Sequence, residues 1–183
     1  MTMTKKSIFA FALCSLLFAS CTIDNTVNDK PISKPDTGGG ASGPVVVNLF
    51  GYFKANGGAW GDATFTKNGD GSVTYAGSQW SGYALGLYDW DGNLLYPGLN
   101  DLSGYSKFVV EFASATTVPC QVVLNGNPAV NEWGQVGGAW ADAGSTKLEM
   151  SFDGVNVSDL NTYAIQLAAD GSIDIKDIYI VGK

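Results

Sequence analysis

The 183-residue chain contains no histidine and no arginine, so lysine supplies all ten of its basic residues. Without imidazole, neither a Ser-His-Asp triad nor a Cys-His pair can form, and a zinc site would lack its usual nitrogen ligands. Without arginine, the protein cannot bind the carboxylate or phosphate groups of a ligand through bidentate guanidinium contacts. Ten lysines scattered along the chain also fail to give the clustered positive charge that nucleic-acid binding needs. These absences favour a neutral ligand and exclude nucleic acid as a partner.

Cysteine is equally scarce, with only Cys14, Cys21 and Cys120 present. Cys14 and Cys21 both lie in the N-terminal segment described next, which leaves Cys120 alone in the body of the chain. A single cysteine cannot form an intramolecular disulfide, so the stability of the body must come from packing. We expect Cys120 to behave as a small buried apolar residue.

The first residues have the pattern of a bacterial export signal. Lys5 and Lys6 precede an apolar run over residues 8–19, which is shorter than the roughly 20 residues that a membrane-spanning helix needs but typical of a signal-peptide core. The sequence Phe-Ala-Ser-Cys that ends at Cys21 resembles the lipobox of bacterial lipoproteins. That resemblance implies a signal peptide over residues 1–20 and acylation of Cys21. The alternative is an ordinary signal peptide with an accidental cysteine.

A polar segment separates this signal from the rest of the chain. Residues 21–43 are rich in Asp, Asn, Thr, Pro, Gly and Ser, a composition that cannot bury enough apolar surface to offset the entropy of ordering. We interpret it as a flexible linker, which leaves residues 44–183 as one domain. Cleavage of the expected signal peptide removes Lys5 and Lys6 and lowers the formal charge from −7 to −9. We expect a secreted protein that a lipid anchors to a bacterial membrane without spanning it, at the outer membrane or cell surface.

The domain shows period-two alternation and no helical periodicity, which predicts an all-β fold. Each later strand buries one face and leaves the other to solvent, and the many short strands with glycine-rich turns indicate a β-sandwich of antiparallel sheets with almost no helix. Hairpin turns are expected at residues 68–71 and 91–92. A bulge is expected near Lys176 and Asp177, where the alternation breaks. The candidate strands are 45–50, 63–67, 72–76, 83–90, 93–96, 105–112, 120–125, 146–152, 163–168 and 172–181.

Three segments of this domain carry a family resemblance. They are Asp-Leu-Ser-Gly-Tyr-Ser-Lys-Phe-Val-Val-Glu-Phe at 101–112, Ile-Asp-Ile-Lys-Asp-Ile-Tyr-Ile at 173–180, and Gln-Trp-Ser-Gly-Tyr at 79–83. The domain resembles a galactose-binding-like jelly-roll carbohydrate-binding module, nearest to families 4 and 22. The resemblance implies a jelly-roll sandwich and a structural calcium ion held in part by Asp177. The position of a usual glutamate ligand is occupied by Lys54. No other cofactor is expected.

Five tryptophans lie among Gly, Asn, Gln and Asp residues rather than in apolar runs. Gly-Gly-Ala-Trp occurs twice, at 57–60 and at 137–140, and we interpret each glycine pair as a sharp turn that presents the indole on a rim. An indole face can cover the C–H patch of a sugar ring, while neutral amides can donate to and accept from its hydroxyls. Because tryptophan is mostly buried on average, we expect two or three of the five indoles to belong to the core, and an alternative role for Trp90 is to staple a hairpin. The candidate sugar-binding residues are Trp60, Trp80, Trp133, Trp140, Gln79, Asn125, Gln135 and Gln166.

The sequence therefore predicts a lipoprotein that binds a neutral polysaccharide or oligosaccharide without cleaving it, beside separate polysaccharide-degrading or transport proteins. One alternative is a small jelly-roll glycoside hydrolase, which needs two carboxyl groups at a defined separation. Glu111 and Glu132 are the candidate pair, although nothing in their spacing requires it. The other alternative is an adhesive surface lipoprotein whose exposed aromatic residues bind a protein.

Overall fold

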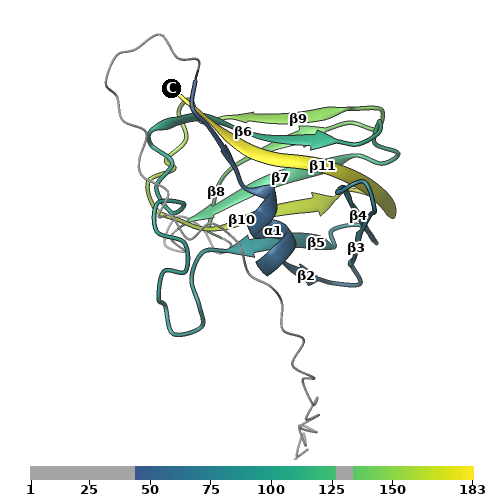
Figure 1. Cartoon of the computed structure of the whole chain (residues 1–183), viewed down its shortest axis with the longest axis horizontal. Helices are drawn as coiled ribbons and strands as arrows, with labels where there is room; N and C mark the ends of the chain where they lie inside the picture. The colour runs from purple at the N-terminus through teal and green to yellow at the C-terminus, as the bar shows by residue number, and fades with distance from the viewer. Residues whose placement is uncertain (1–43, 127–133) are drawn as a thin grey trace, which may run out of the picture. The chain divides into compact units, whose positions relative to one another are not determined.

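The computed structural model describes residues 44–126 and 134–183, which form two antiparallel β-sheets packed face to face (Figure 1). The first sheet has the strand order β3-β4-β11-β6-β9, with β1 also paired to β11, and the second has the order β2-β5-β10-β7-β8. This confirms the predicted β-sandwich. The first sheet contains β1 (Val46–Asn48), β3 (Thr64–Lys67), β4 (Val73–Gly77), β6 (Tyr105–Phe112), β9 (Lys147–Ser151) and β11 (Gly171–Gly182). The second contains β2 (Gly58–Trp60), β5 (Gly82–Gly86), β7 (Cys120–Gly126), β8 (Gln135–Ala141) and β10 (Leu160–Leu167).

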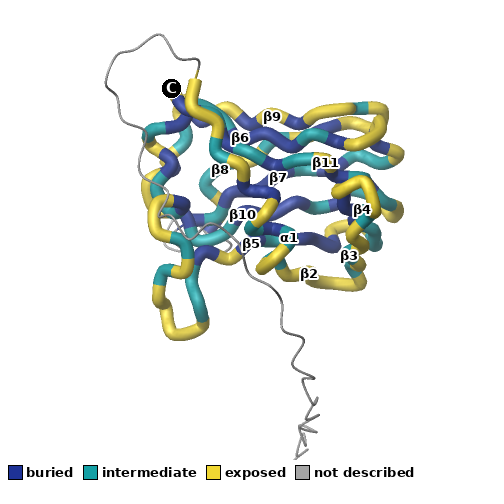
Figure 2. Tube along the Cα trace, in the orientation of Figure 1, coloured by how far each residue is buried: buried dark blue, intermediate teal, exposed yellow. Residues whose placement is uncertain are grey.

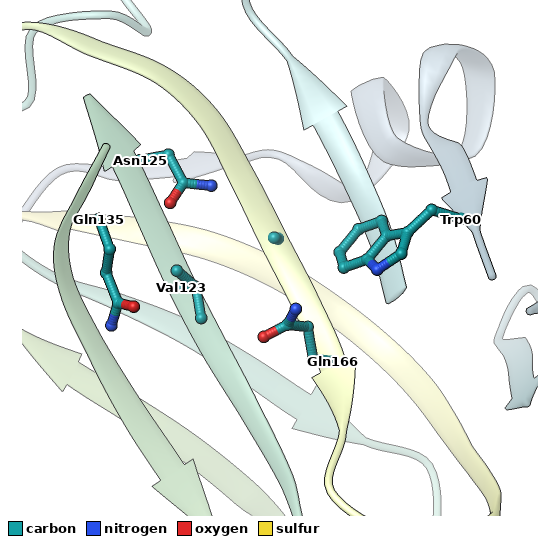
Figure 3. A pocket seen from close by; sticks show the side chains of 6 residues that line it. Trp60, Val123, Asn125, Gln135 and Gln166 are labelled. Atoms are coloured by element: carbon teal, nitrogen blue, oxygen red, sulfur yellow. The ribbon is translucent and has the colours of Figure 1, made fainter. Parts of the chain in front are cut away.

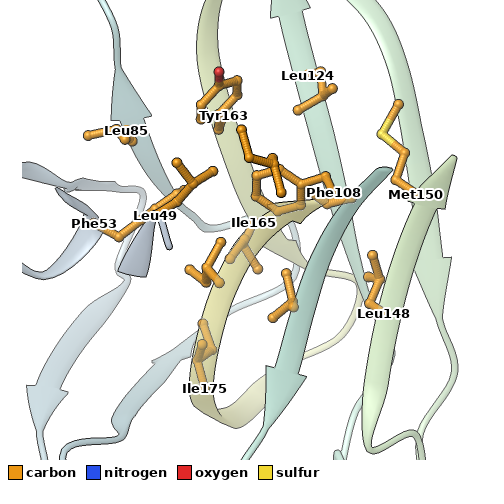
Figure 4. Close-up of a cluster of buried hydrophobic side chains, with 14 of the residues drawn as sticks. Leu49, Phe53, Leu85, Phe108, Leu124, Leu148, Met150, Tyr163, Ile165 and Ile175 are labelled. Carbon is orange, nitrogen blue, oxygen red and sulfur yellow. The ribbon is translucent and has the colours of Figure 1, made fainter. Parts of the chain in front are cut away.

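Alternating side chains build the core between the sheets. Buried and more accessible positions succeed each other along the strands, as Figure 2 shows. On β6, Phe108 points into the core and its ring centroid lies 5.7 Å from that of Tyr163 on β10. Leu124 on β7 and Met150 on β9 fill the space beside them (Figure 4). The predicted core-facing residues of β6, β7, β9 and β10 are therefore correct, but the opposite face is not fully solvated, since Val109, Val123 and Ala164 on it are also buried.

The predicted bulge in the last strand is also present. The pairing of β11 with β6 shifts register between Ile175 and Asp177. Because the extra residue restores the phase, Ile175 and Ile178 are both buried although three positions separate them. The turn at residues 68–71 joins β3 to β4 as expected, with the backbone of Gly71 at φ +86°.

Four features of the fold differ from the sequence prediction. The helix α1 (Phe50–Asn56) follows β1 directly and buries Phe50 and Phe53, whereas a strand was expected through residue 50. β2 and β8 were missed, because their glycines carry no hydrophobic signal. The strand expected at 83–90 ends at Gly86. The strand expected at 93–96 is a single bridge between Tyr88 and Leu94.

The environment of Cys120 agrees with the prediction. Its side chain is fully buried in the core, and burial raises the pKa of the thiol to about 12. Among the residues that the structure describes, no helix has the length and apolar character needed to cross a membrane. The expected signal peptide (1–20), Cys21 and the linker (21–43) lie outside the described residues.

Candidate functional site

The outward face of the second sheet carries three rows of side chains that run across its strands. Their neighbours along each strand, such as Tyr83 on β5 and Ile165 on β10, point into the core. Four strand spacings of about 4.8 Å separate β2 from β8, so a full row spans about 19 Å. Read from β2 to β8, the first row is Trp60, Gly82, Gln166, Gln121 and Trp140, and the second is Gly58, Ala84, Ala164, Val123 and Gly138. The third row begins at β5 and is Gly86, Thr162, Asn125 and Gln135.

The middle of this face is hollowed, because its second row has only small side chains. The hollow has a volume of about 350 Å³ and is lined by Trp60, Val123, Asn125, Gln135, Ala164 and Gln166. Ala164 and Val123 form an apolar floor. Figure 3 shows the indole of Trp60 on one side and the three amide side chains on the other. None of these six side chains is charged, so the hollow suits an uncharged ligand with both apolar and hydrogen-bonding surfaces.

The indole of Trp60 is held in place from two directions. A Cβ added to Gly82 on the neighbouring strand would lie only 1.8 Å from Trp60 Cζ2, so the ring lies directly over this glycine. Trp60 Nε1 donates a hydrogen bond to the backbone carbonyl of Trp80 at 3.1 Å. The ring can therefore offer a ligand its face, while its N–H group already has an acceptor within the protein.

Trp80 and Trp140 continue the aromatic surface away from Trp60. Their ring centroids are 6.2 Å apart with an interplanar angle of 85°, an edge-to-face arrangement. Trp80 lies in the loop between β4 and β5, and its backbone has φ +66°. The exposed fraction is 37% for Trp60, 49% for Trp80 and 59% for Trp140. We call these three residues the aromatic wall.

The predicted amides divide into two groups. Asn125, Gln135 and Gln166 all line the hollow, as expected. Gln121 was not predicted, but its Nε2 donates to Gln166 Oε1, which fixes the orientation of the Gln166 amide. Gln79 does not line the hollow; its Nε2 donates to the carbonyl of Ala168 at 2.9 Å, so this side chain helps to hold the Trp80 loop.

The expectation that two or three indoles belong to the core is wrong for the part of the chain that is described. All four tryptophans there are exposed, and Trp90 is the most accessible at 105%. Trp90 lies in the turn between Asp89 and Asn93 and is not among the residues that line the hollow. Trp133 lies outside the described residues. The prediction relied on the average burial of tryptophan. The sequence alone does not show whether each indole points into the core or towards solvent.

The two Gly-Gly-Ala-Trp segments do not form turns, which corrects another interpretation. Gly58–Trp60 is strand β2 and Gly137–Trp140 lies within β8, at the two edges of the same sheet. Their glycines make room for neighbours instead. A Cβ on Gly57 would lie 2.1 Å from Tyr83 Oη, and one on Gly137 would lie 2.4 Å from Met150 Cε.

Glu111, one of the two glutamates proposed as a glycosidase pair, does not line the hollow. Glu111 lies on β6 in the other sheet, where its Oε1 accepts a hydrogen bond from the Tyr179 hydroxyl at 2.8 Å. Glu149 lies on the neighbouring strand β9 and contacts Lys107 at 3.1 Å and also Lys147. Glu132 lies outside the described residues. Within residues 44–126 and 134–183, the hollow thus brings together amides and an indole rather than two carboxyl groups.

Asp177 is hydrogen-bonded to two neighbouring groups in this structure. Its Oδ1 accepts hydrogen bonds from Asn48 Nδ2 at 2.6 Å and from the backbone N–H of Ile178 at 2.8 Å. The described residues contain no group of three or more His, Cys, Asp or Glu side chains that could hold a metal ion. Ca²⁺ also accepts backbone and amide oxygens as ligands, so the calcium site at Asp177 stays a prediction. The amide of Asn48 ties β1 to β11 at this point.

Comparison with known proteins was made with both the sequence and the fold. No family model matches the sequence, and no curated protein matches it. Among solved structures, the low-affinity xylan-binding module CBM86 from Roseburia intestinalis has a TM-score of 0.52 and 13% identity, over 76% of this chain and 96% of that one. The CBM22-1-GH10 modules of xylanase 10B from Clostridium thermocellum, solved with xylohexaose, have a TM-score of 0.53 and 14% identity, over 77% of this chain and 28% of that one. The chain therefore shares the jelly-roll β-sandwich fold of carbohydrate-binding modules.

Proposed function

We propose that the hollow binds a neutral glycan chain without cleaving it. The observation that carries this proposal is the composition of the hollow, in which an exposed indole faces three amides over an apolar floor and no lining side chain is charged. The C–H face of a pyranose ring matches the indole of Trp60 and the methyl group of Ala164. Its hydroxyl groups match Asn125, Gln135 and Gln166, because each amide can both donate and accept.

The expected affinity follows from the area that these groups can cover. One indole face removes about 50 Å² of sugar surface from water, which is worth about 1–1.5 kcal/mol. Two or three such contacts and several hydrogen bonds, less the cost of association, give roughly −4 to −7 kcal/mol. The Kd then lies between about 1 mM and 10 μM. Such binding becomes effective when many copies meet one polymer.

Anchoring by a lipid at Cys21 would provide those many copies on one surface. We infer from the sequence of residues 1–43 that the protein is exported and acylated, and that the linker lets the domain reach a polymer near the outer membrane or cell surface. A weak binder held there would raise the local concentration of glycan for separate degrading enzymes and transporters, which are the partners we propose.

The proposal is tested by affinity gel electrophoresis of the domain in gels that contain a neutral polysaccharide. Xylan is the first polymer to try, since CBM86 is a xylan-binding module and the CBM22-1-GH10 modules were solved with xylohexaose. Mixed-linkage β-glucan, mannan and an α-glucan follow. We expect retardation in at least one gel and no release of reducing sugar in the same samples. Reducing-sugar release would instead support the glycosidase.

Single substitutions locate the binding surface. Trp60→Ala and Trp140→Ala should each weaken retardation, because each removes an exposed indole of the aromatic wall. Trp140 does not line the hollow itself but contacts Trp80 beside it. Trp90→Ala is the matched control, since it removes an even more exposed indole that belongs neither to the hollow nor to the aromatic wall. A parent protein that no neutral polymer retards would refute the function. Equal effects of all three substitutions would refute the site.

A further inference from the structure

The loop between β4 and β5 is tied down on both sides by aspartates that do not line the hollow. Asp62 Oδ1 accepts hydrogen bonds from both the backbone N–H and the hydroxyl of Ser78, each at 2.8 Å. Asp170 Oδ1 accepts one from the backbone N–H of Gln79 at 2.9 Å. Both aspartates are exposed. They restrain a four-residue loop, Ser78–Ser81, from two sides.

The loop restrains Trp80 in a backbone conformation that its side chain does not favour. Trp80 is the one non-glycine residue at positive φ in the described part of the chain, with φ +66°. Bulky residues persist there only when surrounding contacts determine the conformation, and they are frequent in ligand clamps. Those contacts include a hydrogen bond from Trp80 N to the carbonyl of Leu167 at 2.9 Å and one from Ser81 N to the carbonyl of Ser78 at 3.1 Å.

This conformation gives Trp80 two contacts at once. Its carbonyl accepts the indole N–H of Trp60, which comes from one edge strand of the sheet. Its ring meets the ring of Trp140, which comes from the opposite edge strand. Trp60 and Trp140 lie on opposite edge strands of the sheet, and Trp80 contacts both of them.

We propose that Trp80 is a positioning residue that fixes Trp60 and Trp140 before the ligand arrives, and that Asp62 anchors it. This inference rests on the proposed glycan binding. Large exposed side chains lose conformational freedom when a ligand immobilises them, and an aromatic wall that is already rigid avoids that loss. The affinity for glycan therefore depends on Asp62, which contacts no part of the hollow.

The chain offers a matched control for this dependence. Asp70 Oδ1 accepts hydrogen bonds from the backbone N–H of Ser72 at 3.0 Å and from its hydroxyl at 2.6 Å, the same pair of bonds that Asp62 makes with Ser78. Asp70, however, lies in the turn between β3 and β4, which belong to the other sheet. Asp62→Ala and Asp70→Ala thus each remove one aspartate that accepts two hydrogen bonds from a serine, and only the first releases the Trp80 loop.

Two measurements on the lipid-free chain test the inference. In the free protein, NMR exchange of the Trp60 indole proton reports its bond to Trp80. In gels that contain xylan, mixed-linkage β-glucan or mannan, retardation reports affinity. We expect Asp62→Ala to speed the indole exchange severalfold and to weaken binding roughly three- to tenfold, the factor that corresponds to ordering one large side chain. Asp70→Ala should change neither.

A second variant separates positioning from direct contact with the glycan. Glycine accepts the left-handed conformation, so Trp80→Gly keeps the carbonyl in place for Trp60 but removes the ring that meets Trp140. We expect it to keep slow exchange at Trp60 and still lose affinity. A parent that binds glycan while Asp62→Ala binds equally well would overturn the inference and leave the proposed function intact. Unchanged indole exchange in Asp62→Ala would also overturn it. A parent that binds no polymer would refute both.

Discussion

Adding one methyl group beneath Trp60 should displace the indole without changing any side chain that lines the hollow. Gly82 lies on β5, and its substitution by alanine would place a Cβ 1.8 Å from Trp60 Cζ2. Real carbon atoms cannot approach so closely, so one group must move. The backbone of β5 is fixed by pairing with β2 and β10, whereas the indole lies at the surface. The ring of Trp60 should therefore swing away.

The size of the effect follows from what the displaced ring contributes. A ring that covers about 50 Å² of a sugar at about 25 cal/mol per Å² supplies about 1.3 kcal/mol, or about a tenfold change in Kd. The same movement breaks the hydrogen bond from Trp60 Nε1 to the carbonyl of Trp80. Stability should change little, because alanine is favoured over glycine within a strand by roughly 0.5–1 kcal/mol, which offsets part of the strain.

Gly86 provides the control for this experiment. It lies on the same strand and the same face, and its added Cβ would meet only the carbonyl of Tyr88 at an ordinary 3.8 Å. Affinity electrophoresis of Gly82→Ala, Gly86→Ala and the parent should show about tenfold weaker binding for the first alone, with thermal unfolding midpoints within a few degrees of one another. Equal binding by Gly82→Ala and the parent would show that Trp60 does not carry the contact.

Three further predictions concern pH, metal and the core. Hydrogen bonds from Ser78 hold the pKa of Asp62 below its ordinary value of 3.8, so the stabilisation is complete above that value and is lost as the pH falls through the lowered pKa. Glycan binding, measured by gel retardation, should be constant from about pH 5 to pH 8 and weaken only below pH 3.8. Because hydrogen bonds from Asn48 and Ile178 already occupy Asp177, a chelator should change neither the melting temperature nor gel retardation, and a loss of either would reveal a metal site. Cys120→Ser should lower the free energy of unfolding by about 1–3 kcal/mol in urea titrations, because it buries a hydroxyl without an assured partner; an unaltered midpoint would contradict the burial of this residue.

The strands whose alternation is uninterrupted could be predicted from the sequence. Phe108, Val110 and Phe112 mark one face of β6 at a strict period of two, and the prediction matches the strand from end to end. β2 and β8 could not be recognised in this way. Their glycines carry no side chain that would reveal a period. Gly137 in β8 makes room for Met150, and Gly57, just before β2, makes room for Tyr83. Such contacts between distant segments are not visible in a local pattern.

The sequence indicated which types of residue form the candidate site, but not which strands bring them together. Asn125 and Gln166 were expected to face a ligand, and both line the hollow. The register that aligns them with Trp60 depends on strand order, since β2 joins this sheet through β5 rather than through its sequence neighbour β3. Gln79 was predicted to bind sugar because of its amide group. Its Nε2 instead donates a hydrogen bond to the backbone carbonyl of Ala168.

The alternation of side chains on β7 and β10 has a consequence for how specificity can change. Leu124 and Tyr163 face the interior, whereas Val123 and Ala164, their immediate neighbours in the chain, form the floor of the hollow. Substitutions on the floor can therefore reshape the cavity for a bulkier or differently substituted ligand while the interior packing stays untouched. In such a sheet the inward-facing residues determine stability and the outward-facing residues determine ligand binding. The same fold can therefore acquire a new binding specificity without compensating changes in its core.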